Sequence, residues 1–184
     1  MTTALLIMDV QNLIVSRIEQ SDQLLANLQQ SIAAARKAKI PVIYVSVKFR
    51  EGFPEVSDDN KTFSTLKSTP AFASPEATAI HPAVQPQPKD VCITKRRVSA
   101  FTGSDLEVVL RAGNIRHLVL TGIATSGVVL STLREAADKD FKITVLEDCC
   151  ADSDKEVHDV LLKKVFPRQA TVINFSEWIG TLHP

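Results

Sequence analysis

Residues 4–9 read Ala4-Leu5-Leu6-Ile7-Met8-Asp9, an unbroken apolar run that ends at a single carboxylate. The run does not alternate between apolar and polar residues, as a strand with one face in water would. Most of the later runs share this character, which is typical of parallel strands that helices cover on both faces. The later runs lie at residues 42–47, 91–94, 118–120, 143–146 and 171–173.

The segments between these runs carry apolar residues at helical spacing, and alternating strands and helices predict an α/β sandwich with a parallel sheet. The helical stripes begin at Leu24, Leu106, Val129 and Val157. Two spacings, Ser104-x-x-Glu107 and Ser153-x-x-Glu156, predict capping boxes at the start of two of these helices. Gly113 is expected to end one helix in a left-handed conformation.

The composition is that of an ordinary globular protein. Of the 184 residues, 45% are hydrophobic and 23% are charged, and 21 basic side chains balance 21 acidic ones. This length predicts one domain, residues 1–184. Zero net charge gives no overall attraction to nucleic acid or to an anionic membrane surface, so we expect neither as a partner. The N-terminal apolar run is too short for a signal peptide or a membrane span.

The three cysteines, Cys92, Cys149 and Cys150, are an odd and sparse set. They form no Cys-x-x-Cys pair and no zinc-binding spacing with the histidines. Residues 121–127 match neither of the familiar phosphate-binding loops. We therefore expect a cytoplasmic protein with free thiols, no metal and no other cofactor. Cys92 falls inside a predicted strand and is expected in the core.

Residues 48–89 form a long connection that contains six prolines. A compact domain seldom carries so long an irregular stretch without a use, such as a lid, a binding loop or a subunit contact. The alternative is a stiff surface excursion around one short helix near residues 62–66. Both interpretations stay open here, because proline content indicates stiffness and not purpose.

Polar residues follow the predicted strands at the edge of the sheet where ligands bind in open parallel sheets. They are Asp9, Lys95, Thr121-Gly122 and Glu147-Asp148. An acid and a base are thus expected on one edge. Each also has a structural interpretation: Asp9 could cap the following segment, Lys95 could open a solvated basic turn, and Glu147-Asp148 could be a loop pair.

Three motifs in this order resemble the isochorismatase-like hydrolases, a superfamily that includes nicotinamidases, carbamoylases and isochorismatases. The motifs are Leu6-Ile7-Met8-Asp9-Val10-Gln11-Asn12, then Lys95 with Ser99-Ala100-Phe101, then Leu120-Thr121-Gly122-Ile123-Ala124-Thr125. The similarity runs from residue 4 to about residue 175. It implies a three-layer Rossmann-like sandwich around a six-stranded parallel sheet, assembled as a homo-oligomer, a dimer or larger.

The resemblance also implies a catalytic triad of aspartate, lysine and cysteine in the amidase branch of the family. Asp9 and Lys95 match the first two, whereas Val128 stands at the position of the cysteine. Valine has no nucleophilic atom, so the resemblance implies a variant without the cysteine mechanism. In this variant Asp9 is the acid or base and Lys95 its electrostatic partner. Cys149 and Cys150 are expected to be buried structural thiols and not substitutes for the nucleophile.

The resemblance further implies the surroundings of the substrate and the geometry of the pair. The Asp9 carboxylate and the Lys95 ammonium should lie within about 4 Å, and a cis peptide should join Ile123 to Ala124. The backbone amides of the turn after the fourth strand should cradle an oxyanion. The implied substrate-binding residues are Gln11, Phe101, Ala124, Thr125, Ser126, Gly127 and Val128.

We thus predict a hydrolase of a small anionic metabolite, either a vinyl ether or an amide. The alternative is a catalytically inactive small-molecule-binding or interaction protein on the same fold. Val128 favours the alternative. Retention of Asp9 and Lys95 favours the enzyme, because a buried ion pair costs desolvation energy. Burial should raise the pKa of Asp9 and Lys95 should lower it; we expect the pair to keep Asp9 ionised at neutral pH.

Overall fold

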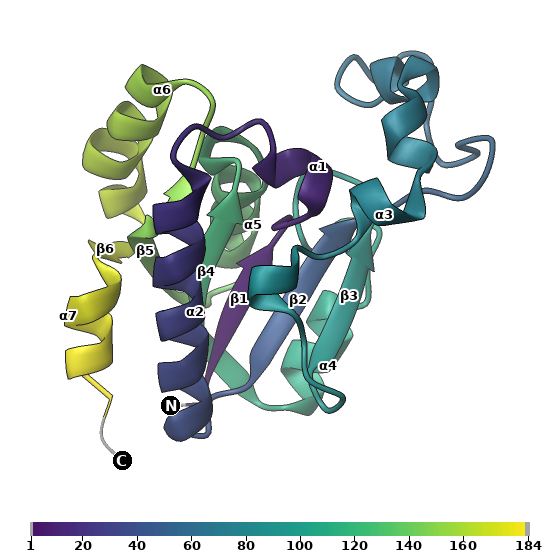
Figure 1. Cartoon of the computed structure of the whole chain (residues 1–184). Helices are drawn as coiled ribbons and strands as arrows, with labels where there is room; N and C mark the ends of the chain where they lie inside the picture. The colour runs from purple at the N-terminus through teal and green to yellow at the C-terminus, as the bar shows by residue number, and fades with distance from the viewer. Residues whose placement is uncertain (1, 183–184) are drawn as a thin grey trace.

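The computed structural model describes residues 2–182, apart from the side chains of residues 70 and 73. Its centre is the predicted six-stranded sheet, in the order β3-β2-β1-β4-β5-β6, with every neighbouring pair parallel (Figure 1). The strands are β1 (Thr2–Met8), β2 (Val42–Val47), β3 (Val91–Lys95), β4 (Ile115–Ile123), β5 (Lys142–Ala151) and β6 (Thr171–Ile173). One domain over residues 1–184 stays a prediction; Met1, His183 and Pro184 lie outside the described residues.

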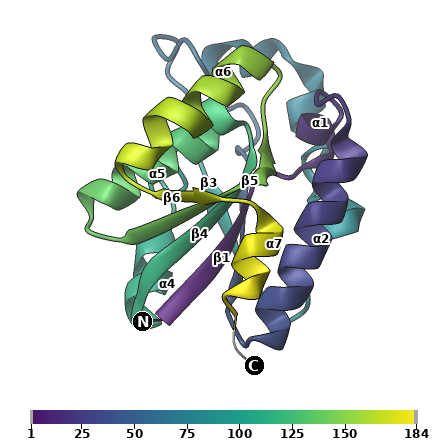
Figure 2. The ribbon, with the colours of Figure 1, turned by 90° about the vertical axis from the view of Figure 1, so that its left-hand side faces the viewer.

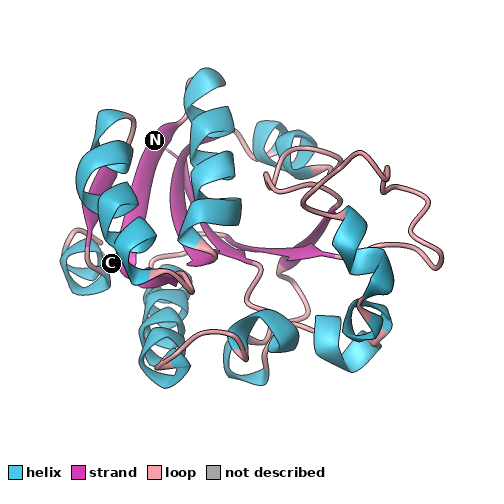
Figure 3. Cartoon of the chain, turned by 90° about the horizontal axis from the view of Figure 1, so that it is seen from above, coloured by secondary structure: helices cyan, strands magenta, loops and turns pink. Residues whose placement is uncertain are grey.

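Helices cover both faces of the sheet and complete the three predicted layers (Figures 2 and 3). One face carries α2 (Ser21–Lys37) and α7 (Phe175–Gly180). The other carries α4 (Leu106–Ala112), α5 (Leu130–Asp138) and α6 (Lys155–Val160). Two short helices, α1 (Asn12–Val15) and α3 (Pro75–Thr78), lie in connections. Single helical turns span Ser64–Ser68, Pro70–Ala73, Pro82–Val84, Thr125–Val129, Leu161–Val165 and Phe166–Arg168. None of the described helices is long and apolar enough to cross a membrane.

Each strand sends alternate side chains into two separate cores. On β1, Leu6 and Met8 pack in the core beneath α4 and α5, whereas Leu5 and Ile7 pack in the core beneath α2 and α7. Burial on both faces leaves no place for polar alternation. This is the physical reason that the apolar run at residues 4–8 predicted a central parallel strand.

Strands β4 and β5 are longer than predicted, so Thr121 and Gly122 lie inside β4 and not in the turn after it. The pairing of β4 with β5 shifts between Leu120 and Gly122, which lets the end of β5 continue beside β4. Gly122 has a φ of 132°, and a Cβ built there would lie 2.0 Å from the carbonyl oxygen of Met8. Only glycine therefore lets β1 and β4 approach this closely.

Both predicted capping boxes are wrong, whereas α4 ends where predicted, with Gly113 as its C-cap residue but not in a left-handed conformation. At α6 the cap is Asp154, not Ser153, and its carboxylate accepts a first-turn N–H at 3.0 Å. At α4 the Ser104 hydroxyl accepts the N–H two residues later at 3.1 Å, outside capping-box geometry. Gly113 has a φ of −82°, and the left-handed residue is the next one, Asn114. Neighbouring residues of similar capping and turn preference compete for these positions, so spacing alone does not select one.

The long connection between β2 and β3 contains three single helical turns and α3, instead of one short helix near residues 62–66. It projects to one side of the sheet in Figure 1. Its end is fixed by an ion pair of 2.6 Å between Arg36 and Asp90, and its middle by a hydrogen bond of 2.9 Å from Arg97 to the carbonyl of Glu55. The connection is thus held against the body at several points.

Candidate active site

Asp9 and Lys95 form the predicted ion pair at the carboxyl edge of the sheet. Asp9 follows β1 and Lys95 ends β3, with β2 between these two strands. Lys95 Nζ lies 2.9 Å from Asp9 Oδ2, and the two side chains are 2% and 7% exposed. Lys95 Nζ also donates to the carbonyl of Arg97 at 2.9 Å. Lys95 therefore does not open a solvated basic turn.

The second carboxylate oxygen of Asp9, Oδ1, is buried and has no hydrogen-bond partner among the residues that the structure describes. Asp9 does not cap α1, whose N-cap residue is Gln11. Its backbone has a φ of 55°, a left-handed conformation that non-glycine residues seldom adopt and that costs about 1–3 kcal/mol. Buried polar atoms normally have partners. Oδ1 is therefore an acceptor without a donor, at a position where a ligand or a water could supply one.

Burial raises the pKa of Asp9 above that of an ordinary aspartate. The Lys95 ammonium and its hydrogen bond lower the same pKa, but burial has the larger effect. Both predicted influences on the pKa of Asp9 are therefore present, and that of burial is the larger. When Asp9 is ionised, its raised pKa makes it a stronger base than a solvent-exposed aspartate.

The side chain of Gln11, which is predicted to bind substrate, forms hydrogen bonds within the fold. Its side-chain Oε1 accepts the N–H of Val47 at 2.9 Å. Its Nε2 donates to the carbonyl oxygens of Val47 at 3.1 Å and of Thr78 at 2.6 Å. The side chain thus ties β1 to the end of β2 and to the long connection, and its amide has no donor left for a ligand.

The turn after β4 has the predicted cis peptide between Ile123 and Ala124. Val128, at the position that the family gives to cysteine, is 2% exposed and belongs to the core beneath α4 and α5. Thr125 is also buried, and its Oγ1 lies 2.8 Å from Nδ1 of His158 on α6. The contact between Thr125 and His158 holds the turn against α6, although 33 residues separate the two in the sequence.

The predicted oxyanion cradle is only partly available. The Ser126 N–H donates to the Asp152 carboxylate at 2.7 Å, and the Gly127 N–H donates to the Ala124 carbonyl at 3.0 Å. Two of the amides expected to bind an oxyanion are therefore already engaged. Any such role falls to the amides at the two ends of the turn, at Thr125 and Val128.

Phe101, predicted as a pocket wall, is a core residue. It is 6% exposed, and its ring centroid lies 6.0 Å from that of Phe141. The Lys139 ammonium lies 5.6 Å from the Phe101 ring. Phe101 lines neither of the two cavities described below. The aromatic walls come from elsewhere in the chain.

A cavity of about 520 Å³, here named the connection cavity, lies under the start of the long connection. Its wall includes Lys48, Phe49, Arg50, Phe53, Phe72 and Thr78. Lys48 directly follows β2, and its N–H donates to the carbonyl of Lys95 at 3.3 Å. Sequence reasoning missed these residues, although a Phe-x-x-x-Phe spacing directly after a predicted strand was a usable signal.

Two of the three cysteines are buried and one is exposed. Cys149 and Cys150 are buried, as predicted, and burial raises the pKa of Cys149 to about 12 and that of Cys150 well above its usual range. Cys92 is exposed and not in the core, because it lies on β3 at the edge of the sheet. Within residues 2–182, no three His, Cys, Asp or Glu side chains come together to hold a metal ion.

Comparison with known proteins agrees with this architecture. Residues 3–177 match the isochorismatase domain. The ureidoacrylate amidohydrolase RutB of Stutzerimonas stutzeri is 29% identical, over 97% of this chain and 77% of its own. The isochorismatase family protein YecD of Escherichia coli O157:H7 is 31% identical, over 98% and 96%. The structure of an isochorismatase family protein from Burkholderia thailandensis has a TM-score of 0.86 and 32% identity, over 98% and 95%.

Proposed function

The chain belongs to the isochorismatase family, and from this membership we propose that it hydrolyses a small anionic metabolite through Asp9 and Lys95, without a cysteine nucleophile. One observation carries the proposal. One carboxylate oxygen of Asp9 accepts a hydrogen bond from Lys95. The other oxygen is buried, and no donor in the described part of the chain reaches it. A buried acceptor without a partner costs stability, so its retention is explained by a donor that arrives with the substrate.

In the proposed reaction Asp9 is a general base. Its Oδ1 accepts a proton from a water, and the water oxygen forms a bond to the acyl carbon of the substrate. The bond from that carbon to the leaving nitrogen then breaks, and the proton on Asp9 passes to this nitrogen. Lys95 stays protonated throughout and offsets the negative charge of the substrate and of the intermediate.

The amide class is supported by RutB, whose name describes it as an amidohydrolase. Direct attack by water is supported by Val128, since no thiol stands at the start of the helix that follows the turn. In the vinyl-ether alternative Asp9 would be an acid that protonates the substrate. The base role is preferred because the Lys95 ammonium at 2.9 Å needs an acceptor, which an ionised Asp9 supplies.

We propose that the anionic part of the substrate lies in the connection cavity, which neither Asp9 nor Lys95 lines and whose wall includes one acidic side chain, Glu51, beside Lys48 and Arg50. Lys48 in its wall forms no ion pair within the described part of the chain, whereas Arg50 pairs with Glu55 at 2.6 Å. Phe49 and Phe53, with ring centroids 5.6 Å apart, supply an apolar surface beside these charges. A small molecule with one carboxylate and one flat apolar group suits this wall. Assembly as a homo-oligomer stays a prediction.

The test is the dependence of kcat on pH, measured with a panel of small carboxylate-bearing amides and vinyl ethers. We expect kcat to fall on acidification, with a midpoint above the ordinary aspartate range of about 4. Asp9→Asn should lower kcat by about a thousandfold and leave substrate binding unchanged, because general-base catalysis is lost while the shape is kept. Asp148→Asn removes another half-buried carboxyl outside the site and is the matched control. Loss of activity as the pH rises would instead assign Asp9 the role of acid.

Val128 favours a second candidate, an inactive protein that binds small molecules on this fold. In that case neither the native protein nor Asp9→Asn would turn over any member of the panel, while both would bind a small carboxylate. Turnover of any member of the panel by the native protein, lost in Asp9→Asn, would exclude this candidate.

A further inference from the structure

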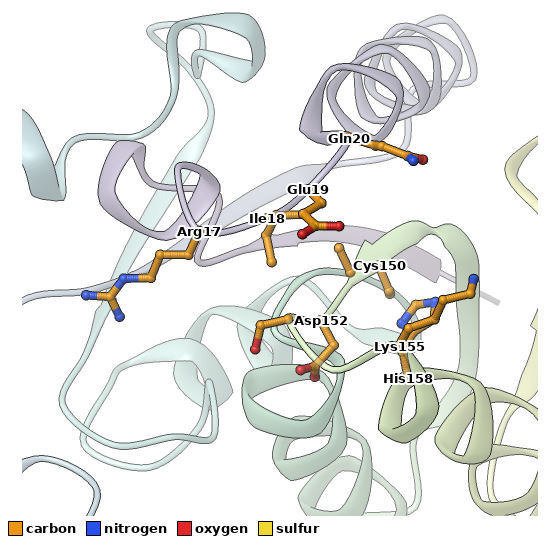
Figure 4. A pocket seen from close by; sticks show the side chains of 10 residues that line it. Arg17, Ile18, Glu19, Gln20, Cys150, Asp152, Lys155 and His158 are labelled. Atoms are coloured by element: carbon orange, nitrogen blue, oxygen red, sulfur yellow. The ribbon is translucent and has the colours of Figure 1, made fainter.

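A second cavity, of about 370 Å³, lies at the carboxyl edge on the β4–β5 side of β1, away from Lys95. We name it the β5 cavity. One wall is the segment 17–20, which joins α1 to α2; the other is the end of β5 with the start of α6 (Figure 4). Neither Asp9 nor Lys95 lines it. Whatever it binds is therefore separate from the ion pair.

His158 on α6 presents a hydrogen-bond donor to this cavity. Its Nδ1 lies 2.8 Å from the Thr125 hydroxyl, and no other side-chain hydrogen bond of that hydroxyl is found in the described residues. Because Thr125 is fully buried, its hydroxyl proton has only this nitrogen to bind. Nδ1 therefore accepts, and the ring proton sits on Nε2. Burial lowers the pKa of His158, which keeps the ring neutral near pH 7.

Side chains of both charges line the same cavity. Lys155 lies one helical turn before His158, so the two stand next to each other on α6. Glu19 and Asp152 lie on opposite walls (Figure 4). Neither Glu19 nor Lys155 forms an ion pair in the described part of the chain. The cavity thus offers donors at one end and carboxylates along its walls.

Asp152 is partly engaged but still able to accept. Its two oxygens receive the N–H groups of Ser126 at 2.7 Å and of Asp154 at 3.3 Å, and a carboxylate has about four acceptor sites. Arg17 does not add a charge to the cavity, because its side chain points away in Figure 4 and its guanidinium lies 5.7 Å from the Phe72 ring. Ile18, Cys150 and Ala151 give the cavity an apolar part, and the polar residues Gln20 and Ser153 complete its lining.

We propose that the β5 cavity binds a small zwitterion of the α-amino acid class. Its carboxylate would contact the Lys155 ammonium and the His158 Nε2–H, its ammonium would contact Glu19 and Asp152, and an apolar side chain would lie against Ile18. Both charges of the ligand are needed, because the cavity wall carries an ammonium, Lys155, and two carboxylates, Glu19 and Asp152. This binding does not depend on the proposed hydrolysis, because Asp9 and Lys95 do not line the cavity.

The test uses three matched probes with the native full-length protein: L-leucine, 4-methylpentanoate, which lacks the ammonium, and 3-methylbutylamine, which lacks the carboxylate. Calorimetric titration should show L-leucine binding at least about tenfold more tightly than either analogue, since each loses one charged contact. The amide resonance of Ser126 should shift on titration with L-leucine, because this N–H donates to Asp152. Equal binding of the three probes would overturn the proposal. So would the absence of L-leucine binding at a concentration of about 10 mM.

Variants separate the cavity from the fold. His158→Asn keeps an acceptor near Nδ1 for Thr125 but removes the Nε2 donor, and Lys155→Ala removes an exposed ammonium. Each should weaken L-leucine binding by about tenfold. Lys164→Ala, an exposed lysine outside the cavity, is the matched control and should change binding by less than about twofold. Unchanged affinity in both His158→Asn and Lys155→Ala would overturn the assignment to this cavity.

Discussion

Each edge of the sheet, amino and carboxyl, holds one titratable side chain among its strands. The two side chains differ in whether their polar atoms all have hydrogen-bond partners. At the amino edge, His117 on β4 has Nδ1 3.1 Å from the Thr3 hydroxyl and Nε2 2.9 Å from the Thr144 hydroxyl. At the carboxyl edge, Asp9 has one oxygen paired with Lys95 and one oxygen with no partner. The first group joins three neighbouring strands, whereas the second is incomplete.

The difference separates a structural polar group from a chemical one. A buried imidazole with both nitrogens satisfied gains specificity for the fold and has no atom left to react. A buried carboxylate with one free oxygen is less stable than it could be, and that oxygen is free to exchange a proton. Burial alone does not identify a site; at Asp9 the buried oxygen without a partner points to chemistry because it stands beside the ion pair with Lys95 at the carboxyl edge.

The largest effect is expected from a substitution that forces β1 and β4 apart at the carboxyl edge. Gly122→Ala would place a Cβ 2.0 Å from the Met8 carbonyl oxygen, next to Asp9. We expect a loss of more than about 4 kcal/mol in the free energy of unfolding, because backbone must move. Urea denaturation measures it. Gly180→Ala, where a Cβ meets nothing within 4 Å, is the control and should change stability by less than about 1 kcal/mol. A small effect at Gly122 would mean that β1 and β4 can separate without cost.

Removing one partner of the ion pair should produce the next largest effect. Lys95→Met leaves the Asp9 carboxylate buried without a counter-charge, and we expect a loss of about 3 kcal/mol at pH 7. The loss should shrink on acidification, because protonation of Asp9 removes the unpaired charge. The double variant Asp9→Asn, Lys95→Met should recover most of the stability at pH 7. A double variant no more stable than Lys95→Met would argue against a charge-based cost.

The amino edge should determine how stability depends on pH. Burial, Lys142 and the N-terminal amine together lower the pKa of His117 to about 4 from an ordinary 6.5. Between these values the unfolded chain binds a proton that the folded chain does not, so stability falls as the pH decreases through this window. Allowing for its partial exposure, we expect His117 to account for about 1–2 kcal/mol. His117→Gln should flatten this part of a pH series of urea midpoints.

The smallest effect concerns the thiols. Cys92 lies near the start of β3, whereas Cys149 and Cys150 lie near the carboxyl end of β5. Under native conditions iodoacetamide should modify Cys92 alone, since Cys149 and Cys150 are buried and their raised pKa keeps them protonated. Intact-mass analysis should show one adduct, with the free energy of unfolding changed by less than about 0.5 kcal/mol. Two or three adducts on the folded protein would show that a thiol at the carboxyl edge is reachable after all.

The sequence predicted the parts of the molecule that depend on local pattern. All six strands follow from apolar runs, and the meeting of Asp9 with Lys95 follows from the rule that parallel strands end at one edge. The cis peptide at Ile123–Ala124 came from the resemblance alone. Where an apolar run stops was harder to predict, because Thr121 and Gly122 are polar or small yet continue β4.

The parts that were wrong or missed depend on partners far apart in the chain. Gln11 was taken for a substrate ligand because nothing near it reveals that its amide bonds to Thr78, 67 residues away. Ser126 lost its amide to Asp152, 26 residues later, for the same reason. Periodicity and motif spacing carry no information about such pairs, which form only when two connections fold over the same edge.

The link at Gln11 has a consequence for the way in which the folded molecule opens. Besides the side-chain bonds of Gln11, two backbone hydrogen bonds join this segment to the long connection. The N–H of His81 donates to the carbonyl of Val10 at 2.9 Å, and the N–H of Asn12 donates to the carbonyl of Ala79 at 3.0 Å. The long connection can therefore lift from the sheet only when these bonds break together. The amides of Asn12 and His81 should then exchange with deuterated water at one common rate, as a single opening unit. The frequency at which this unit opens then determines how often a molecule can reach the buried edge beside Asp9.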